Sequence, residues 1–373
     1  MKKVGLITFH QPINFGAALQ SVALSKAIES CGCRCEILNY INPTFKKNYK
    51  VFSFKSCHSF KQLIWNILMV PFRIKQKIQF SNFIKMNACL TRKYNKKMLS
   101  NASKEYDMFF TGSDQVWNYK CSGKDASYFL DFVENKPKVS YAASFGDFVV
   151  SEQYKKEYAN YISDMSAISV RESSGADIVK QLTGRDALQC LDPTLLLDAK
   201  QWGDVIKCED RICKEPYILV YFMAQSSEIK KHIFEVAQKL KNHYGYSIVV
   251  IGGSLHKEKG EIKYCNVSSP ETFLALFRDA SYVLTNSFHG TAFAVNFKKN
   301  FYSYVKPDLE VVGRVESLLN AINLKDRIFS YAKEINIFSD VDYDANEHLL
   351  NAEVEKSYQY IKEVVQKCPK GEL

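Results

Sequence analysis

The sequence predicts an α/β protein built from two Rossmann-like parallel-sheet domains. Its 373 residues exceed the size of one ordinary hydrophobic core and indicate about two domains. Apolar, strand-like runs alternate with helical patterns almost throughout, which is typical of parallel sheets covered by helices. The alternation forms two series, which meet between Asp192 and Trp202. Because such sheets bind ligands beyond the carboxyl ends of their strands, we expect the site in the cleft between the domains.

The first series predicts an N-terminal domain over residues 1–195. The strand-like run VGLITF is followed by a helical pattern over about residues 16–30 and by the strand-like CEILNY. A basic excursion occupies about residues 41–104. Four short strand-like runs come after it, separated by helical or loop-like sequence: YDMFFTG, KVSYAAS, SAISVRE and ALQCLD.

The second series predicts a C-terminal domain over residues 196–345. Strand-like YILVYFMA is followed by a helix over residues 227–243, by YSIVVIGGS and by a short EIKYC. The helical PETFLALFRDA then leads to strand-like SYVLTNS and KNFYSYV. A last helical pattern over residues 345–367 could return to either domain, so we treat residues 346–373 as a separate helix and tail.

Composition predicts a globular, cytoplasmic protein. Hydrophobic residues make up 46% of the chain, and no apolar run approaches the about 20 residues that a membrane-spanning helix needs. The first apolar run breaks at His10 and Pro12, which is too early for a signal peptide. The 11 cysteines lack the spacing of a disulfide framework, and we interpret CGCRC as buried thiols rather than as a metal site.

The net charge of +10 is concentrated in the basic excursion. Residues 41–104 contain 12 Lys, 2 Arg and no Asp or Glu, so this segment carries +14 and the remainder of the chain −4. Trp65, Phe72, Phe80 and Phe83 interleave with its lysines, which suits a segment that inserts aromatic rings among the headgroups of anionic lipids. A solvated basic helix packed on its own domain explains the pattern equally well. No nucleic-acid partner is expected, because no nucleic-acid-binding motif accompanies the charge.

Candidate binding residues follow three strands of the first series. Asn14 and Gly16 stand just before a helix whose free amides attract an anion, although any strand-to-helix turn can use these residues. Arg171, at the end of SAISVRE, is a candidate bidentate clamp for phosphate or carboxylate, and an ion pair with Glu172 or a neighbouring loop is the alternative. Polar side chains and an aromatic ring, which together suit a sugar, follow YDMFFTG: Ser113, Asp114, Gln115, Trp117 and Asn118.

The run SYVLTNSFHGTAFAV places a histidine at the start of a helix in the second domain. Ser287 is a candidate helix cap, and His289 with Gly290 stands in the first turn, where the helix dipole favours a neutral imidazole. A bound phosphate or carboxylate would reverse that preference. We therefore interpret His289 as a ligand-binding residue, and capping of the helix alone is the alternative. His10, beside the end of the first strand, is the one other histidine that could assist.

Seven motifs, in this order, resemble the polysaccharide pyruvyl transferase family: NFGAALQSVAL, TGSDQVWN, SYAASFG, SVRESSGADIV, LDPTLLL, TNSFHGTAFAV and RVESLLNAINLKDR. They cover most of the chain, whereas the basic excursion and the C-terminal helix lie outside the resemblance. The resemblance implies a fold similar to the GT-B glycosyltransferases, with the acceptor on the N-terminal domain and the donor on the C-terminal domain. It also implies transfer of a pyruvyl group from phosphoenolpyruvate to two hydroxyls of a glycan sugar, which forms a cyclic ketal and releases phosphate.

The resemblance also implies roles for individual residues. Family members place a strand-end arginine and the histidine of the HG motif near the donor, so Arg171 and His289 are expected to bind phosphoenolpyruvate and His289 to donate a proton. Arg314, in RVESLL, fits the family pattern and is expected to add positive charge. Asp114 is the candidate base for a sugar hydroxyl, and a structural role for this carboxylate is equally well supported. Neither a metal nor a cofactor is implied.

Two other functions stay open at this point. A GT-B glycosyltransferase that uses a nucleotide sugar would also suit IGGS and the helix before TNSFHG. A non-catalytic, membrane-associated glycan-binding protein would use the basic excursion as its main surface. If the chain is a pyruvyl transferase, its acceptor is a cell-surface polysaccharide or the lipid-linked precursor, which the basic excursion would meet at the inner face of the cell membrane.

Overall fold

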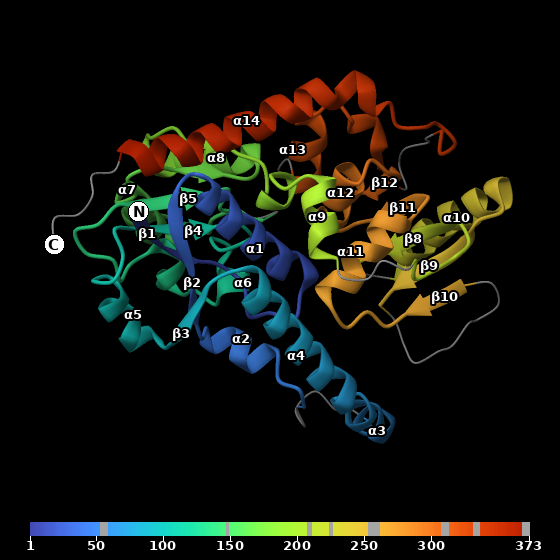
Figure 1. Cartoon of the computed structure of the whole chain (residues 1–373), viewed down its shortest axis with the longest axis horizontal. Coiled ribbons are helices and arrows are strands. Elements are labelled where there is room, and N and C mark those ends of the chain that lie inside the picture. Colours follow the sequence, from blue (N-terminus) through green and yellow to red (C-terminus); the bar gives the residue numbers. More distant parts are fainter. Residues whose placement is uncertain are drawn as a thin grey trace.

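A computed structural model describes residues 1–52, 59–146, 149–206, 211–223, 227–252, 262–306, 313–330 and 336–367. Figure 1 shows two α/β domains side by side, each with a twisted parallel sheet, and a group of helices between the two sheets. The predicted fold class, α/β with two Rossmann-like parallel sheets, is confirmed. Within the described ranges, no helix is both long and apolar enough to cross a bilayer.

The first domain begins at the N-terminus and continues to the segment that joins the domains. Its elements are β1 (Lys2–Ile7), α1 (Phe15–Ser30), β2 (Cys33–Tyr40), α2 (Pro43–Asn48), α3 (Phe60–Leu68), α4 (Val70–Asn87), β3 (Leu90–Tyr94), α5 (Lys96–Ala102), β4 (Met108–Gly112), α6 (Tyr119–Ser122), η2 (Ala126–Phe129), β5 (Lys138–Tyr141), α7 (Glu152–Ser163), β6 (Ser169–Val170), α8 (Ser173–Thr183), β7 (Leu188–Gln189) and η3 (Pro193–Leu195). The segment that joins the domains continues with α9 (Ala199–Val205). The predicted boundary at residue 195 falls at the end of η3, between the two sheets.

The second domain follows, and the last helix completes the chain. Its elements are β8 (Tyr217–Tyr221), α10 (Ser227–Tyr244), β9 (Ser247–Ile251), β10 (Ile262–Cys265), α11 (Pro270–Asp279), β11 (Tyr282–Thr285), α12 (Phe288–Asn296), β12 (Asn300–Tyr304), α13 (Arg314–Ala321), η4 (Lys325–Arg327), β13 (Ile328–Phe329) and α14 (Tyr343–Lys367).

Both sheets have the strand order of a Rossmann fold. The first runs β3-β2-β1-β4-β5 and is extended by isolated parallel bridges to the β6-β7 pair, and the second runs β10-β9-β8-β11-β12-β13. All pairings in these sheets are parallel, so the carboxyl ends of the strands in each sheet lie at one edge. In each sheet the order reverses beside the first strand of the domain, at β1–β4 and at β8–β11, and ligands bind such folds outside that point.

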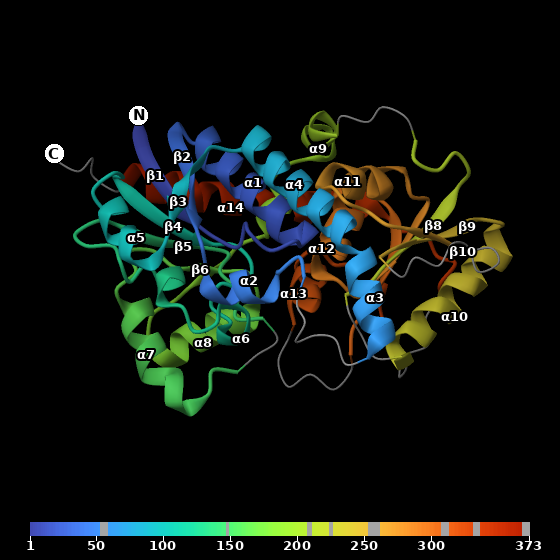
Figure 2. The same cartoon turned by 90° about the horizontal axis from the view of Figure 1, so that it is seen from below.

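Two helices that follow these central strands lie at the interface between the domains. Most residues of α1 and almost every residue of α12 are buried. Helix α1 contacts its own sheet, α4, α11, α14 and η3, and α12 also packs on η3. Asn14 accepts a hydrogen bond from Ala17 N (3.1 Å) and so begins α1. Both helices therefore begin at the junction of the two domains (Figure 2).

The basic excursion is integrated into the first sheet and into the contact between the domains, whereas its sequence indicated a separate insertion. It contains an edge strand of the first sheet, β3, and its long helix α4 contacts both α1 and α11, so it bridges the two domains. The Phe80 ring packs at a tilt against Phe15, whose ring stacks on Phe273 of the second domain at a centroid distance of 4.6 Å. Phe80 and Phe83 are 4% and 0% exposed, so the prediction that these two rings insert into a lipid surface is wrong. Both rings belong to a hydrophobic core that contains residues of both domains.

The last helix, α14, crosses from the second domain to the first, as Figure 1 shows along one side of the molecule. At its start, Tyr343 donates a hydrogen bond to the carbonyl oxygen of Lys299 (2.7 Å) in the second domain. Near its end, Tyr360 donates to the carbonyl oxygen of Ser140 (2.8 Å) in the first domain. The helix therefore packs on both domains rather than on one of them, and it connects them in addition to the segment that joins the domains.

Candidate active site between the two domains

The carboxylate of Asp192 lies at the centre of the candidate site, in the segment that joins the domains. Asp192 follows β7 and caps η3, and its side chain is 0% exposed. Oδ1 accepts hydrogen bonds from the backbone N (3.0 Å) and Oγ1 (2.8 Å) of Thr194. Oδ2 accepts from Nη1 of Arg171 (2.7 Å) and lies 3.0 Å from the hydroxyl of Ser113. This buried anion thus gathers groups that follow three different strands of the first domain.

His289 approaches the same carboxylate from the second domain. It lies in the first turn of α12, whose N-cap Ser287 accepts from Gly290 N at 3.4 Å. His289 Nε2 is 3.7 Å from Asp192 Oδ2, which is within ion-pairing range but longer than a hydrogen bond. The other side of the imidazole packs on Gly16, where an added Cβ would lie 2.0 Å from Nδ1. Glycine at position 16 therefore lets the start of α1 approach the histidine closely.

The guanidinium of Arg171 is buried between the domains. Its residue is 3% exposed, its Nη2 lies 3.7 Å from Asp114 Oδ1, and its Cζ lies 4.4 Å from the centre of the Phe288 ring, a cation–π contact across the interface. Among the described residues, Nε and Nη2 of Arg171 and Nε2 of His289 make no hydrogen bond. Buried donors normally have acceptors, so these three nitrogens are the groups that an acceptor-rich ligand would satisfy.

Electrostatics keep the Asp192 carboxyl ionised. Burial by itself would raise its pKa, but the neighbouring His289 and Arg171 and the hydrogen bond from Thr194 outweigh burial and hold the pKa well below the ordinary value. The charge of Asp192 therefore holds Arg171 and faces the imidazole of His289.

A second buried carboxylate, Glu172, lies next to Arg171 and is 0% exposed. Its Oε1 accepts from Phe145 N (2.7 Å) and from the hydroxyl of Ser144 (3.0 Å). Burial raises the pKa of this carboxyl, and the nearby charges of Arg171 and Arg314 oppose that rise. Glu172 thus secures the loop after β5 and is not the hydrogen-bonded partner of Arg171, because that partner is Asp192.

The loop after β4 divides the predicted sugar-binding residues into two groups. Ser113 and Asp114 face the buried cluster, and Asp114, at φ 66°, sits in the left-handed region that few residues other than glycine adopt. Asn118 caps α6 and donates to Oε1 of Gln115 (3.0 Å), so these two side chains support the loop itself.

The ring of Trp117 does not offer a face to a sugar. It is 0% exposed and stacks on Phe129 at a centroid distance of 5.5 Å and an interplanar angle of 3°. Phe145 packs edge-on against it. An aromatic residue in a polar loop suited a stacking platform, but the hydrophobic core of the first domain encloses it, so we do not retain Trp117 in the candidate site.

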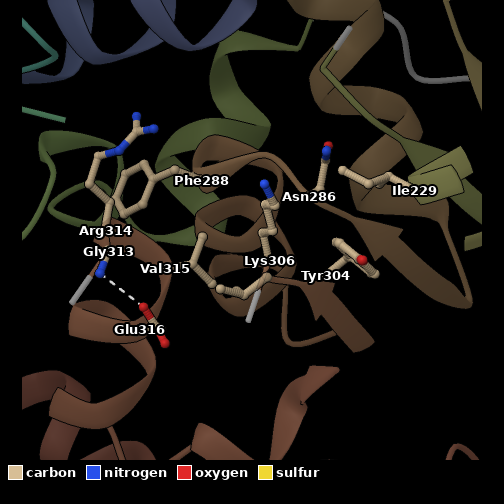
Figure 3. A pocket seen from close by; sticks show the side chains of 10 residues that line it. Ile229, Asn286, Phe288, Tyr304, Lys306, Gly313, Arg314, Val315 and Glu316 are labelled. Carbon is tan, nitrogen blue, oxygen red and sulfur yellow. Dashed lines mark hydrogen bonds between the residues drawn. The ribbon is translucent and has the colours of Figure 1, made fainter. Parts of the chain in front are cut away.

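A pocket of about 190 Å³ opens in the second domain beside this cluster (Figure 3). Asn286 and Phe288 enter it from the end of β11, Lys306 comes from the end of β12, and Arg314 from the first turn of α13. Figure 3 shows the side chain of Arg314 running alongside the Phe288 ring, whose contact with Arg171 links the pocket to the buried cluster.

Asp192, Lys306 and Phe288 are site residues that the sequence analysis missed. Asp192 stands at the end of the strand-like ALQCLD and before a proline, and that position is the signal that could have found it. The sequence analysis used this segment only as the joint between domains. Lys306 likewise follows a recognised strand directly, and Phe288 precedes the recognised histidine. Among the described residues, no group of three or more His, Cys, Asp or Glu is placed to hold a metal ion.

Residues 14–305 match the model of a family described as polysaccharide pyruvyl transferase. The matched range spans the basic excursion and ends before Arg314 and the C-terminal helix. No curated protein sequence matches the chain.

Solved structures share the fold over the whole chain. A protein assigned as a UDP-N-acetylglucosamine 2-epimerase from Listeria monocytogenes has a TM-score of 0.53 at 11% identity, over 100% of this chain and 98% of that chain. The UDP-GlcNAc 2-epimerase from Methanocaldococcus jannaschii has a TM-score of 0.50 at 12% identity, over 98% and 99%. At this identity the likeness shows the fold alone, and that fold is GT-B-like, as the sequence analysis predicted.

Proposed function

Because the chain belongs to the polysaccharide pyruvyl transferase family, we propose that it transfers a pyruvyl group from phosphoenolpyruvate to two hydroxyls of one glycan sugar. The product is a cyclic ketal, and phosphate is released. The observation that carries this proposal is that Arg171 and His289, from opposite domains, both lie against the buried carboxylate of Asp192. The acceptor is a cell-surface polysaccharide or its lipid-linked precursor.

The donor would be bound by the cations of the buried cluster. Phosphoenolpyruvate carries a phosphate and a carboxylate, and bidentate guanidinium groups suit both. Asp192 occupies Nη1 of Arg171, which leaves Nε and Nη2 to face a ligand. Arg314 would add a second guanidinium, and the first amides of α12 add dipolar attraction for an anion. Lys306, in the adjacent pocket, is a further candidate for the phosphate.

Proton transfer would fall to His289 and Asp114. His289, protonated beside Asp192 and the donor phosphate, gives its proton to the methylene carbon of phosphoenolpyruvate, which becomes the methyl group. The first sugar hydroxyl attacks the adjacent cationic carbon and gives its proton to Asp114. The second hydroxyl closes the ketal as the carbon–oxygen bond to phosphate breaks, and its proton leaves with the phosphate. The proton held by Asp114 then returns to His289, so the enzyme is unchanged overall.

The closed arrangement requires the domains to separate for the donor to enter. Arg171 and His289 are only 3% and 8% exposed, so neither can be reached by a ligand of this size in the present arrangement. Closure around the donor would exclude water, which strengthens the electrostatic contacts and protects the cationic intermediate from hydrolysis.

Contact with an anionic membrane is supported by the arm formed by α3 and α4, which projects from the body of the molecule (Figure 1). Seven apolar side chains on this arm are exposed by 44–76%: Phe60, Ile64, Ile67, Leu68, Ile74, Ile78 and Met86. Lysines lie among them, as at Lys61 and Lys75, so the arm offers apolar insertion together with attraction to anionic headgroups. We infer that the arm brings the enzyme to the inner face of the cell membrane.

Calorimetric titration tests the donor directly. We expect phosphoenolpyruvate to bind the wild-type protein and to bind Arg314→Met more weakly, with Lys325→Met, an exposed lysine outside the site, as the control. UDP is the competing ligand, since the solved structures named above are enzymes of UDP sugars by their own descriptions. Binding of UDP together with no binding of phosphoenolpyruvate would favour a glycosyltransferase instead.

A further inference from the structure

A larger pocket, of about 710 Å³, lies wholly in the first domain. Its lining residues include His10 and Ile13 after β1, Asn39 near the end of β2, and Phe80 with neighbouring residues of α4. The pocket has the size of an ordinary small-molecule site. It lies at the carboxyl ends of the strands of the first sheet, the edge at which folds of this class bind ligands.

The charge of this pocket is of one sign. Five lysines line it, from α2 and its end, from α4 and from β3, and no Asp or Glu is among its lining residues: Lys46, Lys50, Lys77, Lys85 and Lys93. Within the described parts of the chain, none of these lysines forms an ion pair. Apolar side chains make up much of the remaining wall, including Ile41, Phe45 and Ile84. A cluster of unpaired like charges is unfavourable for the empty protein, and a bound polyanion would relieve it.

The pocket adjoins the candidate active site. Its wall includes Ile13, and the loop that holds Ile13 leads into α1, where the His289 ring packs on Gly16. Tyr49 also lines the pocket, and the pKa of its phenol is raised first by burial and then by the charge of Asp114. A group held among the lysines would therefore place an attached sugar toward Asp114 and His289.

We propose that this basic pocket binds the diphosphate of a sugar diphosphate, and that the sugar so anchored is the one that receives the pyruvyl group. The assignment of this ligand as the acceptor rests on the proposed function. A diphosphate fits better than a single carboxylate, because it brings two negative charges rather than one to a pocket lined by five lysines. The diphosphate could be attached to a lipid or to a nucleoside, and the apolar arm of α3 and α4 next to the pocket favours the lipid.

The test is calorimetric binding of inorganic pyrophosphate to the full-length protein at physiological ionic strength. The pocket variant is Lys46→Gln/Lys77→Gln/Lys93→Gln. The matched control, Lys47→Gln/Lys75→Gln/Lys97→Gln, removes the same charge from nearby positions that do not line the pocket. We expect the pocket variant to bind pyrophosphate at least about tenfold more weakly, and the control to bind within about threefold of wild type, because long-range charge effects are screened by salt.

Competition then identifies the carrier. Farnesyl diphosphoryl-N-acetylglucosamine in detergent and UDP-N-acetylglucosamine are each tested for displacement of pyrophosphate, and displacement by either supports the proposal. Equal loss of affinity in both triple variants, or no displacement by either sugar diphosphate, would overturn it. The two proposals fail separately: pyrophosphate binding without any pyruvyl transfer would remove only the proposed function. Pyruvyl transfer to an unphosphorylated oligosaccharide that the pocket variant leaves unchanged would remove only the basic pocket.

Discussion

Replacement of Asp192 by Asn removes the buried charge at the joint and keeps the shape of the side chain. Arg171, 3% exposed, would then be left with Asp114 at 3.7 Å as its nearest counter-charge. Two opposite charges about 4 Å apart attract by about 4 kcal/mol at an effective dielectric constant of 20. Removing one partner of a buried ion pair typically lowers the free energy of unfolding by about 3–5 kcal/mol. Because Arg171 keeps its contact with Asp114, we expect a loss at the lower end of this range, about 3 kcal/mol.

Urea unfolding at pH 7 measures this loss. The folded-state pKa of Asp192 lies below the ordinary value of 3.8, so its contribution is fully present at pH 7 and is lost only as the pH falls below about 3.8. Asp198→Asn is the matched control, because Asp198 also caps a helix but is exposed, and Asn caps nearly as well. A loss below about 1 kcal/mol in Asp192→Asn, or no coupling with Arg171→Met in a double-mutant cycle, would refute the reasoning.

Three further predictions follow from the same geometry. Gly16→Ala should displace the His289 ring and lower turnover, because its Cβ would lie 2.0 Å from Nδ1. Gly203→Ala is the control and should keep full turnover, because an added Cβ there has nothing within 4 Å. Equal turnover in the two variants would contradict the contact between Gly16 and His289. Ile64→Ser/Leu68→Ser should reduce sedimentation of the protein with anionic vesicles, whereas the control Val149→Ser/Leu188→Ser, at exposed positions outside the arm, should not. Equal recovery of the wild-type protein with neutral and with anionic vesicles at low salt would reject the membrane contact. Burial lowers the pKa of His10 below 6.5, so the folded state takes up its proton less readily than the unfolded state, and stability should fall by up to about 1.4 kcal/mol as the pH drops from 7.5 to 5.5. His10→Gln should lose that part of the pH dependence in urea unfolding, and an unchanged difference curve would contradict it.

The fold could be predicted from the sequence because its strands are short apolar runs separated by recognisable helix starts. Asn14 and Ser287 do cap helices that follow the central strands of the two sheets. The packing of the basic excursion was harder to predict, because no local sequence feature distinguishes Phe80 on a helix that bridges two domains from an aromatic ring on a helix that faces lipid. Its burial depends on Phe15 and on Phe273, which lies nearly two hundred residues away.

The candidate site, too, could be predicted from the sequence only in part. Arg171 and His289 stand at strand ends, so their positions followed from the alternation of strands and helices. The role of Asp192 did not follow from this alternation, because its partners Arg171 and His289 reach it only when segments distant in sequence meet in the fold. Trp117 shows the opposite error, since a loop rich in polar residues can still direct its aromatic ring into the core.

Turnover with phosphoenolpyruvate tests the central claim most directly. Phosphate release and the mass of the glycan acceptor are followed together in wild type and in His289→Asn, with folding checked by urea unfolding. We predict one phosphate released for each acceptor that gains a pyruvyl ketal, and a fall of at least about 100-fold in His289→Asn, as expected for loss of a general acid. An undiminished rate in folded His289→Asn, or an acceptor that gains a sugar from a nucleotide sugar instead, would contradict the account.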